Sequence, residues 1–179
     1  VLSEKRDFEG AVHFIFQPAE EGGGGGKAMI DDGLFEKFPC DAVFAIHNKP
    51  GVPLGHIVSR PGPLLAAADR WDIRITGKGG HAAHPRTPAA PMIVGASIVM
   101  SLQTIVSREV KPGKTAVVTV GTIHGGTKRN IISDEVKLEL TLRSYEEEVM
   151  DRLIASIRRI CRGTAEAAGV PADRLPVVT

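Results

Sequence analysis

The stretch Phe14–Gly26 constrains the fold of this chain more than any other. A short apolar run ends at Gln17-Pro18, two adjacent glutamates follow after one alanine, and five glycines come next. The run is too short for a helix and predicts a buried strand, which Pro18 ends because proline cannot donate to a sheet ladder. Adjacent carboxylates repel unless a cation or a proton lies there. Glu20 and Glu21 therefore indicate either a charge-handling site at a strand tip or a solvated surface turn.

The composition is that of a soluble globular protein, with 179 residues, 42% hydrophobic and 24% charged. The net charge of +1 gives no reason to expect nucleic acid or an anionic membrane as a partner. No uninterrupted apolar stretch approaches the roughly 20 residues that span a bilayer, and we expect a cytoplasmic location. Cys40 and Cys161 are too few for a disulfide framework, so both are expected to be reduced and buried.

The chain begins at Val1 without a methionine and ends in Val177-Val178-Thr179, which resembles the start of a strand. We therefore expect it to be a fragment of a longer protein.

Residues 1–68 have the pattern of part of an α/β layer. Apolar runs at 11–16, 42–46 and 55–60 predict strands, and a helix is predicted between the first two, at 27–35. In such a layer the functional site lies at the carboxyl ends of the strands.

Residues 69–179 have a different pattern, in which apolar and polar residues alternate along the predicted strands. Half-buried strands are predicted near 71–76, 115–122 and 136–143, with a helix between the first two. Ser144-x-x-Glu147 predicts a capping box that opens a last helix. The order predicts a ferredoxin-like α+β domain with a four-stranded antiparallel sheet, its last strand truncated, and two helices on one face.

The glycine run lies between a strand and a helix, but it is not a phosphate-binding loop. That loop needs a glycine at position 21 and a serine or threonine at 28, where this chain has Glu21 and Ala28. A better set is Glu20, Glu21 and His47, whose oxygen and nitrogen donors suit zinc or manganese. One glutamate could bind metal while the other takes a proton from metal-bound water. Taken alone, His47 is more readily interpreted as a hydrogen-bonded histidine that ends a strand.

Other polar residues carry weaker signals. His81 and His84 lie in a turn rich in glycine and proline, which argues against a helical metal pair, and His84 is interpreted as a plain loop residue. Arg143 lies on the polar face of its strand, where a solvated arginine and a substrate-binding one are about equally expected.

Several motifs in one order resemble the amidohydrolase branch of the aminoacylase/carboxypeptidase metallopeptidases, which includes hippurate hydrolases and auxin-conjugate hydrolases. They are Phe-Gln-Pro-Ala-Glu-Glu-Gly-Gly-Gly-Gly, Ala-Ile-His-Asn-Lys-Pro-Gly, Arg-Pro-Gly-Pro, Gly-Lys-Gly-Gly-His-Ala-Ala-His-Pro and Val-Thr-Val-Gly-Thr-Ile-His-Gly-Gly-Thr. The resemblance runs from about residue 11 to the end of the chain.

The resemblance implies a hydrolase of N-acyl amino acids that uses two divalent metal ions, zinc or manganese. It implies a three-layer α/β zinc-peptidase domain, present here in part (1–68), followed by a lid domain (69–179) that also makes a homodimer. It further implies a role for each candidate residue: Glu20 as general base, Glu21 and His47 as metal ligands, His81 as oxyanion donor in the partner's active site, and Asn130 and Arg143 as substrate-binding residues.

Two departures from the family pattern limit these roles. The family's remaining metal ligands lie before residue 1 and after residue 179, so we expect this chain alone to bind metal weakly or not at all. As it stands, it could be a non-catalytic dimerisation module. Ala90-Pro91 replaces the usual Asp-Pro, which predicts a lost helix cap.

Overall fold

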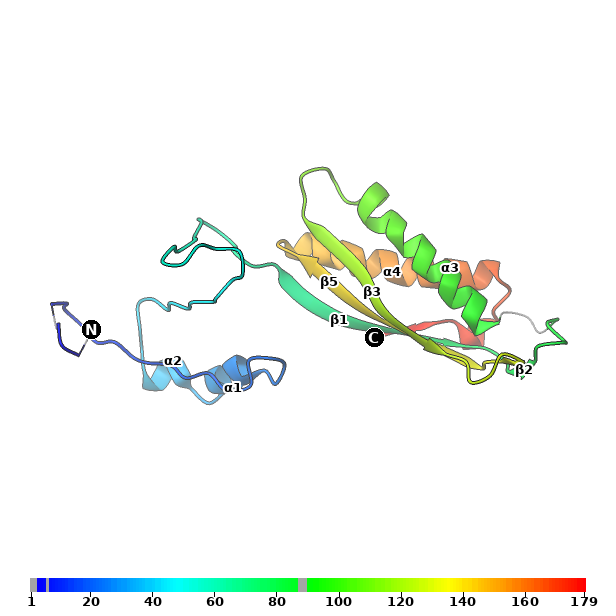
Figure 1. Ribbon diagram of the computed structural model, residues 1–179, viewed down its shortest axis with the longest axis horizontal. Helices are drawn as coiled ribbons and strands as arrows, with labels where there is room; N and C mark the ends of the chain where they lie inside the picture. The colour runs from blue at the N-terminus through cyan, green and yellow to red at the C-terminus, as the bar shows by residue number, and fades with distance from the viewer. Residues whose placement is uncertain (1–2, 6, 87–89) are drawn as a thin grey trace. The chain divides into compact units, whose positions relative to one another are not determined.

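The structure is a computed structural model that describes residues 3–5, 7–86 and 90–179. It divides into two compact units, Val1–Ile57 and Val58–Thr179, which we call unit 1 and unit 2 (Figure 1). Residues 58–66, which precede the first strand, belong to unit 2.

Unit 1 contains two short helices, α1 (Gly25–Asp31) and α2 (Leu34–Lys37). The strands predicted at 11–16, 42–46 and 55–60 are wrong for this structure, because none of these runs is paired within the described residues. A strand forms only through hydrogen bonds to a neighbouring strand. Here the apolar runs stay uncovered, with Phe16 86% and Ile46 97% exposed.

Unit 2 is built on a four-stranded antiparallel sheet in the order β3-β5-β1-β6. Its strands are β1 (Ala67–Thr76), β3 (Ala116–Gly125), β5 (Glu135–Ser144) and β6 (Val177–Val178). Helix α3 (Pro91–Thr104) connects β1 to β3, and α4 (Glu147–Ala167) connects β5 to β6. A π-helical turn, η1 (Ile105–Glu109), extends α3, and a 3-10 turn, η2 (Ala172–Arg174), precedes β6. This order and topology confirm the predicted ferredoxin-like arrangement.

Both helices cover the same face of the sheet (Figure 1). The alternation of the strands directs one set of side chains into a single core with the helices. That core includes Ile73 and Ile75 of β1, Val136, Leu138, Leu140 and Leu142 of β5, Val94, Ile98 and Leu102 of α3, and Leu153 and Ile157 of α4. The other face of the sheet, which α3 and α4 leave open, carries charged residues of β1 and β5 such as Arg70, Lys137 and Arg143.

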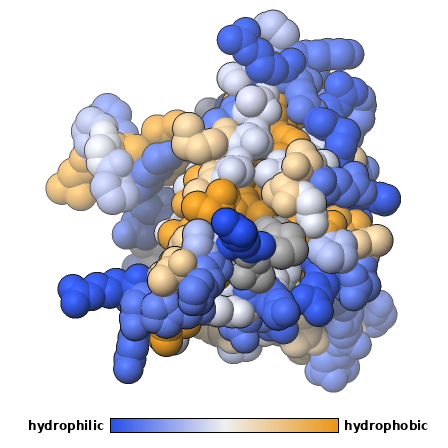
Figure 2. Space-filling view, turned by 90° about the vertical axis from the view of Figure 1, so that its right-hand side faces the viewer, coloured by the Kyte–Doolittle hydropathy of each residue, from blue (hydrophilic) through white to orange (hydrophobic). Residues whose placement is uncertain are grey.

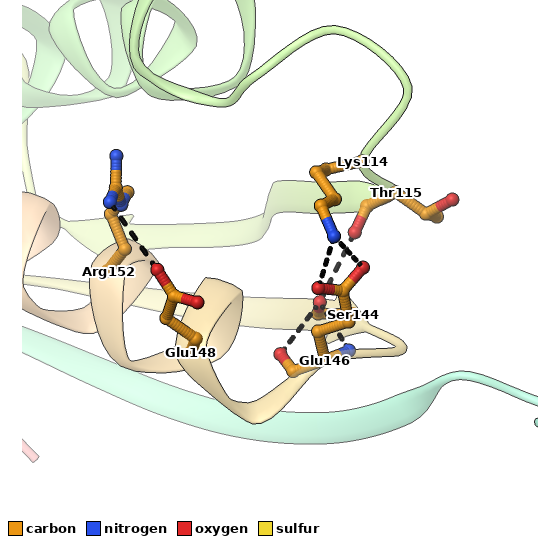
Figure 3. Close-up of polar contacts among 6 residues, drawn as sticks. All are labelled: Lys114, Thr115, Ser144, Glu146, Glu148 and Arg152. Atoms are coloured by element: carbon orange, nitrogen blue, oxygen red, sulfur yellow. Dashed lines mark hydrogen bonds and ion pairs between the residues drawn. The ribbon is translucent and has the colours of Figure 1, made fainter.

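The start of α4 differs from its prediction. The helix begins at Glu147, and its N-cap residue is Glu146, which makes no side-chain capping bond. Ser144 does not cap the helix because it is still part of β5. Its hydroxyl accepts the N–H of Glu146 and lies 3.2 Å from the carbonyl oxygen of Thr115 (Figure 3). The ion pair from Lys114 to Glu146 joins the chain before β3 to this helix start.

Within residues 3–5, 7–86 and 90–179, one helix is long and apolar enough to cross a bilayer. It consists of α3 and its π-helical extension. This differs from the sequence expectation. The core contacts of Val94, Ile98, Leu102 and Ile105 explain much of its apolar character, because these side chains pack inside unit 2.

The start of α3 lacks a side-chain cap, as the substitution of the family's aspartate predicts. Ala90 is the N-cap residue in an extended conformation, and Pro91 is the first helical residue. We expect Ala90→Asp to stabilise unit 2 by about 1 kcal/mol, because its carboxylate can accept one of the free N–H groups of the first turn. Thermal unfolding measures this change, with Ala96→Asp on the exposed helix interior as control. A lower melting temperature for Ala90→Asp would contradict the cap assignment.

The π-helical turn places Glu109 against α4. Its carboxylate accepts hydrogen bonds from Arg159 at 2.6 Å and from buried Ser156 at 2.7 Å. These bonds, that from Arg159 first, hold the pKa of Glu109 below its usual value of 4.5. A lowered pKa means that the contact stabilises the fold above about pH 4.5 and loses its effect as the pH falls through the folded-state pKa.

We expect Glu109→Gln to destabilise unit 2 by about 1.5 kcal/mol at neutral pH, because hydrogen bonds to a charged acceptor are lost. The difference from the wild type should shrink below pH 4. The matched control is Glu148→Gln, since Glu148 forms only an exposed pair with Arg152 at 3.8 Å (Figure 3). Urea unfolding at several pH values measures both variants. A pH-independent loss for Glu109→Gln would contradict the ionic role.

The two cysteines lie in different surroundings. Cys161 is buried in the core, and burial raises the pKa of its thiol to about 12. Cys40 is exposed in the loop after α2, so its predicted burial is wrong in this structure.

Candidate active site

The turn that carries Glu20 and Glu21 is fixed by backbone geometry. Ala19 adopts a positive φ of 49°, which is uncommon for a residue with a side chain, and its carbonyl oxygen accepts the N–H of Gly23 at 3.0 Å. A Cβ at Gly25 would lie 1.8 Å from the carbonyl oxygen of Pro18. The glycine there allows α1 to begin directly against the end of the apolar run. Both glutamates are exposed on this turn.

His47 follows the second apolar run and is also exposed. Its Nδ1 lies 2.6 Å from the carbonyl oxygen of Asn48. Because a carbonyl oxygen only accepts, Nδ1 carries the proton in the neutral ring. This leaves the Nε2 lone pair available, which is the arrangement of a metal-binding histidine.

His81 lies in a second, two-stranded sheet at one end of unit 2. This sheet pairs β2 (Gly80–His81) with β4 (Ile131–Ile132). The next residue, Ala82, donates its N–H to the carbonyl oxygen of Asn130 at 3.0 Å. The structure therefore brings His81 and Asn130 together across about 50 residues of sequence.

The ring of His81 is oriented by its own turn. Its Nδ1 accepts the N–H of Ala83 at 3.1 Å, so the proton of the neutral ring is on Nε2. His81 thus presents a hydrogen-bond donor to solvent. Figure 2 looks at the end of unit 2 that carries β2 and β4, where hydrophobic residues lie among hydrophilic ones. The exposed apolar residues near this end include Ile131 and Met92.

Arg143 lies elsewhere in unit 2. It is near the carboxyl end of β5, opposite Ala68 of β1 and Val117 of β3. Eight residues separate it from the start of β5 at Glu135, which is about 26 Å along the strand. Within unit 2, the structure does not bring Arg143 to His81 and Asn130.

No group of three His, Cys, Asp or Glu side chains could hold a metal ion within the described residues. Glu21 and His47 have the donor types that zinc and manganese take.

Residues 1–176 match peptidase family M20/M25/M40. The chain belongs to this family. It is 42% identical over 154 residues to N-acetyl-L-cysteine deacetylase of Bacillus subtilis, covering 86% of the chain and 36% of that protein. It is 40% identical over 162 residues to hippurate hydrolase of Campylobacter jejuni, covering 90% of the chain and 42% of that protein. This M20 chain therefore spans less than half the length of these relatives.

A solved structure agrees with this assignment. It is a Bacillus subtilis protein described as a dinuclear metal-binding peptidase of the M20 family, 30% identical to this chain. The match has a TM-score of 0.69 and covers 93% of this chain and 39% of that one.

Part of this M20 chain's site geometry was not visible in its sequence. The β2–β4 pairing, which joins His81 to Asn130, was missed because two-residue strands have no periodicity to detect. A usable signal was the pair of glycine-flanked polar turns, Gly77–His81 and Gly125–Asn130, at the ends of β1 and β3.

Proposed function

We propose that the complete protein hydrolyses the amide bond of N-acyl amino acids, hippurate or a related conjugate, with two bound zinc or manganese ions. The observation that carries this proposal is the geometry of the turn: two carboxylates, Glu20 and Glu21, follow directly after Ala19, whose backbone has a positive φ of 49°. The family membership and two relatives named for amide hydrolysis support it.

Each candidate residue then has a chemical task. The metal ions, when bound, supply an activated water and polarise the substrate carbonyl. Glu21 and Nε2 of His47 would hold metal, and Glu20 would accept the proton of the attacking water and pass it to the leaving amine. His81 donates its Nε2–H to the oxygen that becomes negative in the transition state. Asn130 and Arg143 are proposed to bind substrate, with the guanidinium suited to a carboxylate. Because they lie at opposite ends of unit 2, one substrate molecule would contact Asn130 of one subunit and Arg143 of the other in the proposed homodimer.

Unit 2 is proposed to be the lid domain and to form a homodimer through the edge of its sheet. Strand β3 is an edge strand of ten residues in which His124 is the only side chain able to carry a charge. In natural proteins, the edge strands of sheets are usually protected against pairing with another chain by lysine, by proline or by being very short. Beside it, α3 exposes Ile93 (67%) and Met100 (72%). An antiparallel edge pairs with its own copy about a two-fold axis, so a second copy of the chain fits this surface.

The experiment that tests the activity uses the complete gene product. Metal is removed with a chelator, and hydrolysis of hippurate and N-acetylcysteine is followed by amine release before and after manganese or zinc is restored. We expect activity only with metal. Hydrolysis that survives chelation, or no hydrolysis of any N-acyl amino acid after reloading, would overturn the proposal.

A further inference from the structure

Two arginines lie side by side on the open face of the unit 2 sheet. Arg70 of β1 is opposite Thr141 of β5, and Arg143 lies two residues further along β5. The residues of β1 and β5 that enter the core, such as Ile73 and Leu142, have the opposite parity, so both arginines point away from the helices. Diagonal neighbours of this kind have Cα atoms about 7–8 Å apart, within reach of long side chains.

Most other charges on this face are neutralised by partners. Lys137 forms ion pairs with Asp72 and Glu139, both at 2.8 Å, and Arg74 pairs with Glu135 at 3.6 Å. Within the described part of the chain, neither Arg70 nor Arg143 has an ion pair or a side-chain hydrogen bond. On the open face, the charged side chains toward Glu135 therefore form ion pairs with one another. The arginines toward Ser144 have no such partners among the described residues and give that half of the face a positive charge.

The neighbours of the two arginines leave room for a ligand. Ala68 of β1 and Val117 of β3 lie opposite Arg143, and Thr141 and its partner Thr119 lie two residues back along the sheet. Small side chains leave the guanidinium groups accessible, and the hydroxyls can donate hydrogen bonds. Arg60 stacks on Tyr145 at the same end of β5, with its Cζ 5.9 Å from the ring centroid, and adds positive charge. Arginine stays charged at any ordinary pH, so these groups repel each other until an anion binds.

We propose that Arg70 and Arg143 form a subsite for the amino-acid part of a substrate that carries two carboxylates, as in an N-acyl aspartate or glutamate. This inference rests on the proposed function, in which Arg143 holds the substrate carboxylate. One guanidinium is satisfied by one carboxylate in a bidentate pair. A second, unpaired guanidinium at the diagonal position therefore selects a second carboxylate, on the side chain of the amino acid.

The test compares N-acetylglutamate with N-acetylglutamine, which has nearly the same shape without the second charge, in the metal-loaded complete gene product. We expect the wild type to prefer N-acetylglutamate by at least about 10-fold in kcat/KM, because charge-assisted hydrogen bonds are the strong ones. Arg70→Gln should bring this preference close to one, mainly through KM, and Arg70→Lys should retain part of it. Arg74→Gln is the matched control, since Arg74 lies on the same strand and face but has its own partner; its preference should stay as in the wild type.

The outcomes separate the two proposals. No hydrolysis of either compound, or of hippurate, would mean that the proposed function fails. Hydrolysis without a preference for N-acetylglutamate, or a preference that Arg70→Gln leaves unchanged, would overturn the subsite alone. An equal loss for both compounds in Arg70→Gln would show that both arginines hold one carboxylate, which also overturns the assignment to a dicarboxylate.

Discussion

Replacing Glu20 by glutamine is expected to lower kcat of the complete protein by about 10³-fold while metal binding is unchanged. Glutamine keeps the size of the side chain and its place on the turn, but it cannot accept the proton of the attacking water. The strained turn at Ala19 is part of the backbone and should persist in the variant. Steady-state kinetics on an N-acyl amino acid, together with metal analysis of the same sample, measures both quantities.

Glu21→Gln is the matched control for this prediction, because Glu21 lies next to Glu20 on the same turn. As a proposed ligand, it should lose metal, and added metal should restore part of the activity. If Glu20→Gln lost its metal and Glu21→Gln kept it, the two roles would be the reverse of those proposed.

His81→Ala is expected to lower kcat by about 10²- to 10³-fold with a smaller change in KM, the effect of losing an oxyanion donor. This effect is expected because the structure favours the tautomer of His81 that has its proton on Nε2. With the N–H of Ala83 on Nδ1, the neutral ring has its proton on Nε2 and can donate without a charge. Alanine removes this donor and leaves the β2–β4 backbone pairing in place.

His84→Ala is the control for His81. His84 lies three residues away with its ring centroid 6.0 Å from that of His81, and it is interpreted as a loop residue. Its substitution should change kcat little. Equal losses in the two variants would point to a general disturbance of the turn, and an unchanged kcat in His81→Ala would exclude His81 from the site.

The fold of unit 2 could be predicted from sequence because its signals are local. Val136, Leu138, Leu140 and Leu142 alternate with polar residues, and this pattern alone assigns one face of β5 to the core. Unit 1 could not be predicted in the same way. The strands expected at 11–16 and 42–46 depend on neighbouring strands for their hydrogen bonds, and sequence pattern does not report whether such neighbours are present.

The sequence suggests which residues form the candidate site, but it does not give the orientation of their side chains. Motifs identified Glu20, Glu21 and His47, whereas the proton positions of His47 and His81 follow from single contacts to the backbone. Ser144 shows the same limit: its spacing to Glu147 fits a capping box, but the pairing of β5 with β1 and β3 holds it in the strand. The sequence pattern around Ser144 is compatible with both a helix cap and the end of a strand, and it does not indicate which of the two forms.

The most direct test of the account combines two inactive variants. Glu20→Gln and His81→Ala are co-expressed with different tags. In the mixed dimer, the His81→Ala subunit contributes Glu20 and its partner contributes His81, which completes one active site of two. Since random pairing makes about half of the dimers mixed, roughly a quarter of the wild-type kcat should return. Activity no higher than that of the separate variants would contradict an active site shared between two subunits.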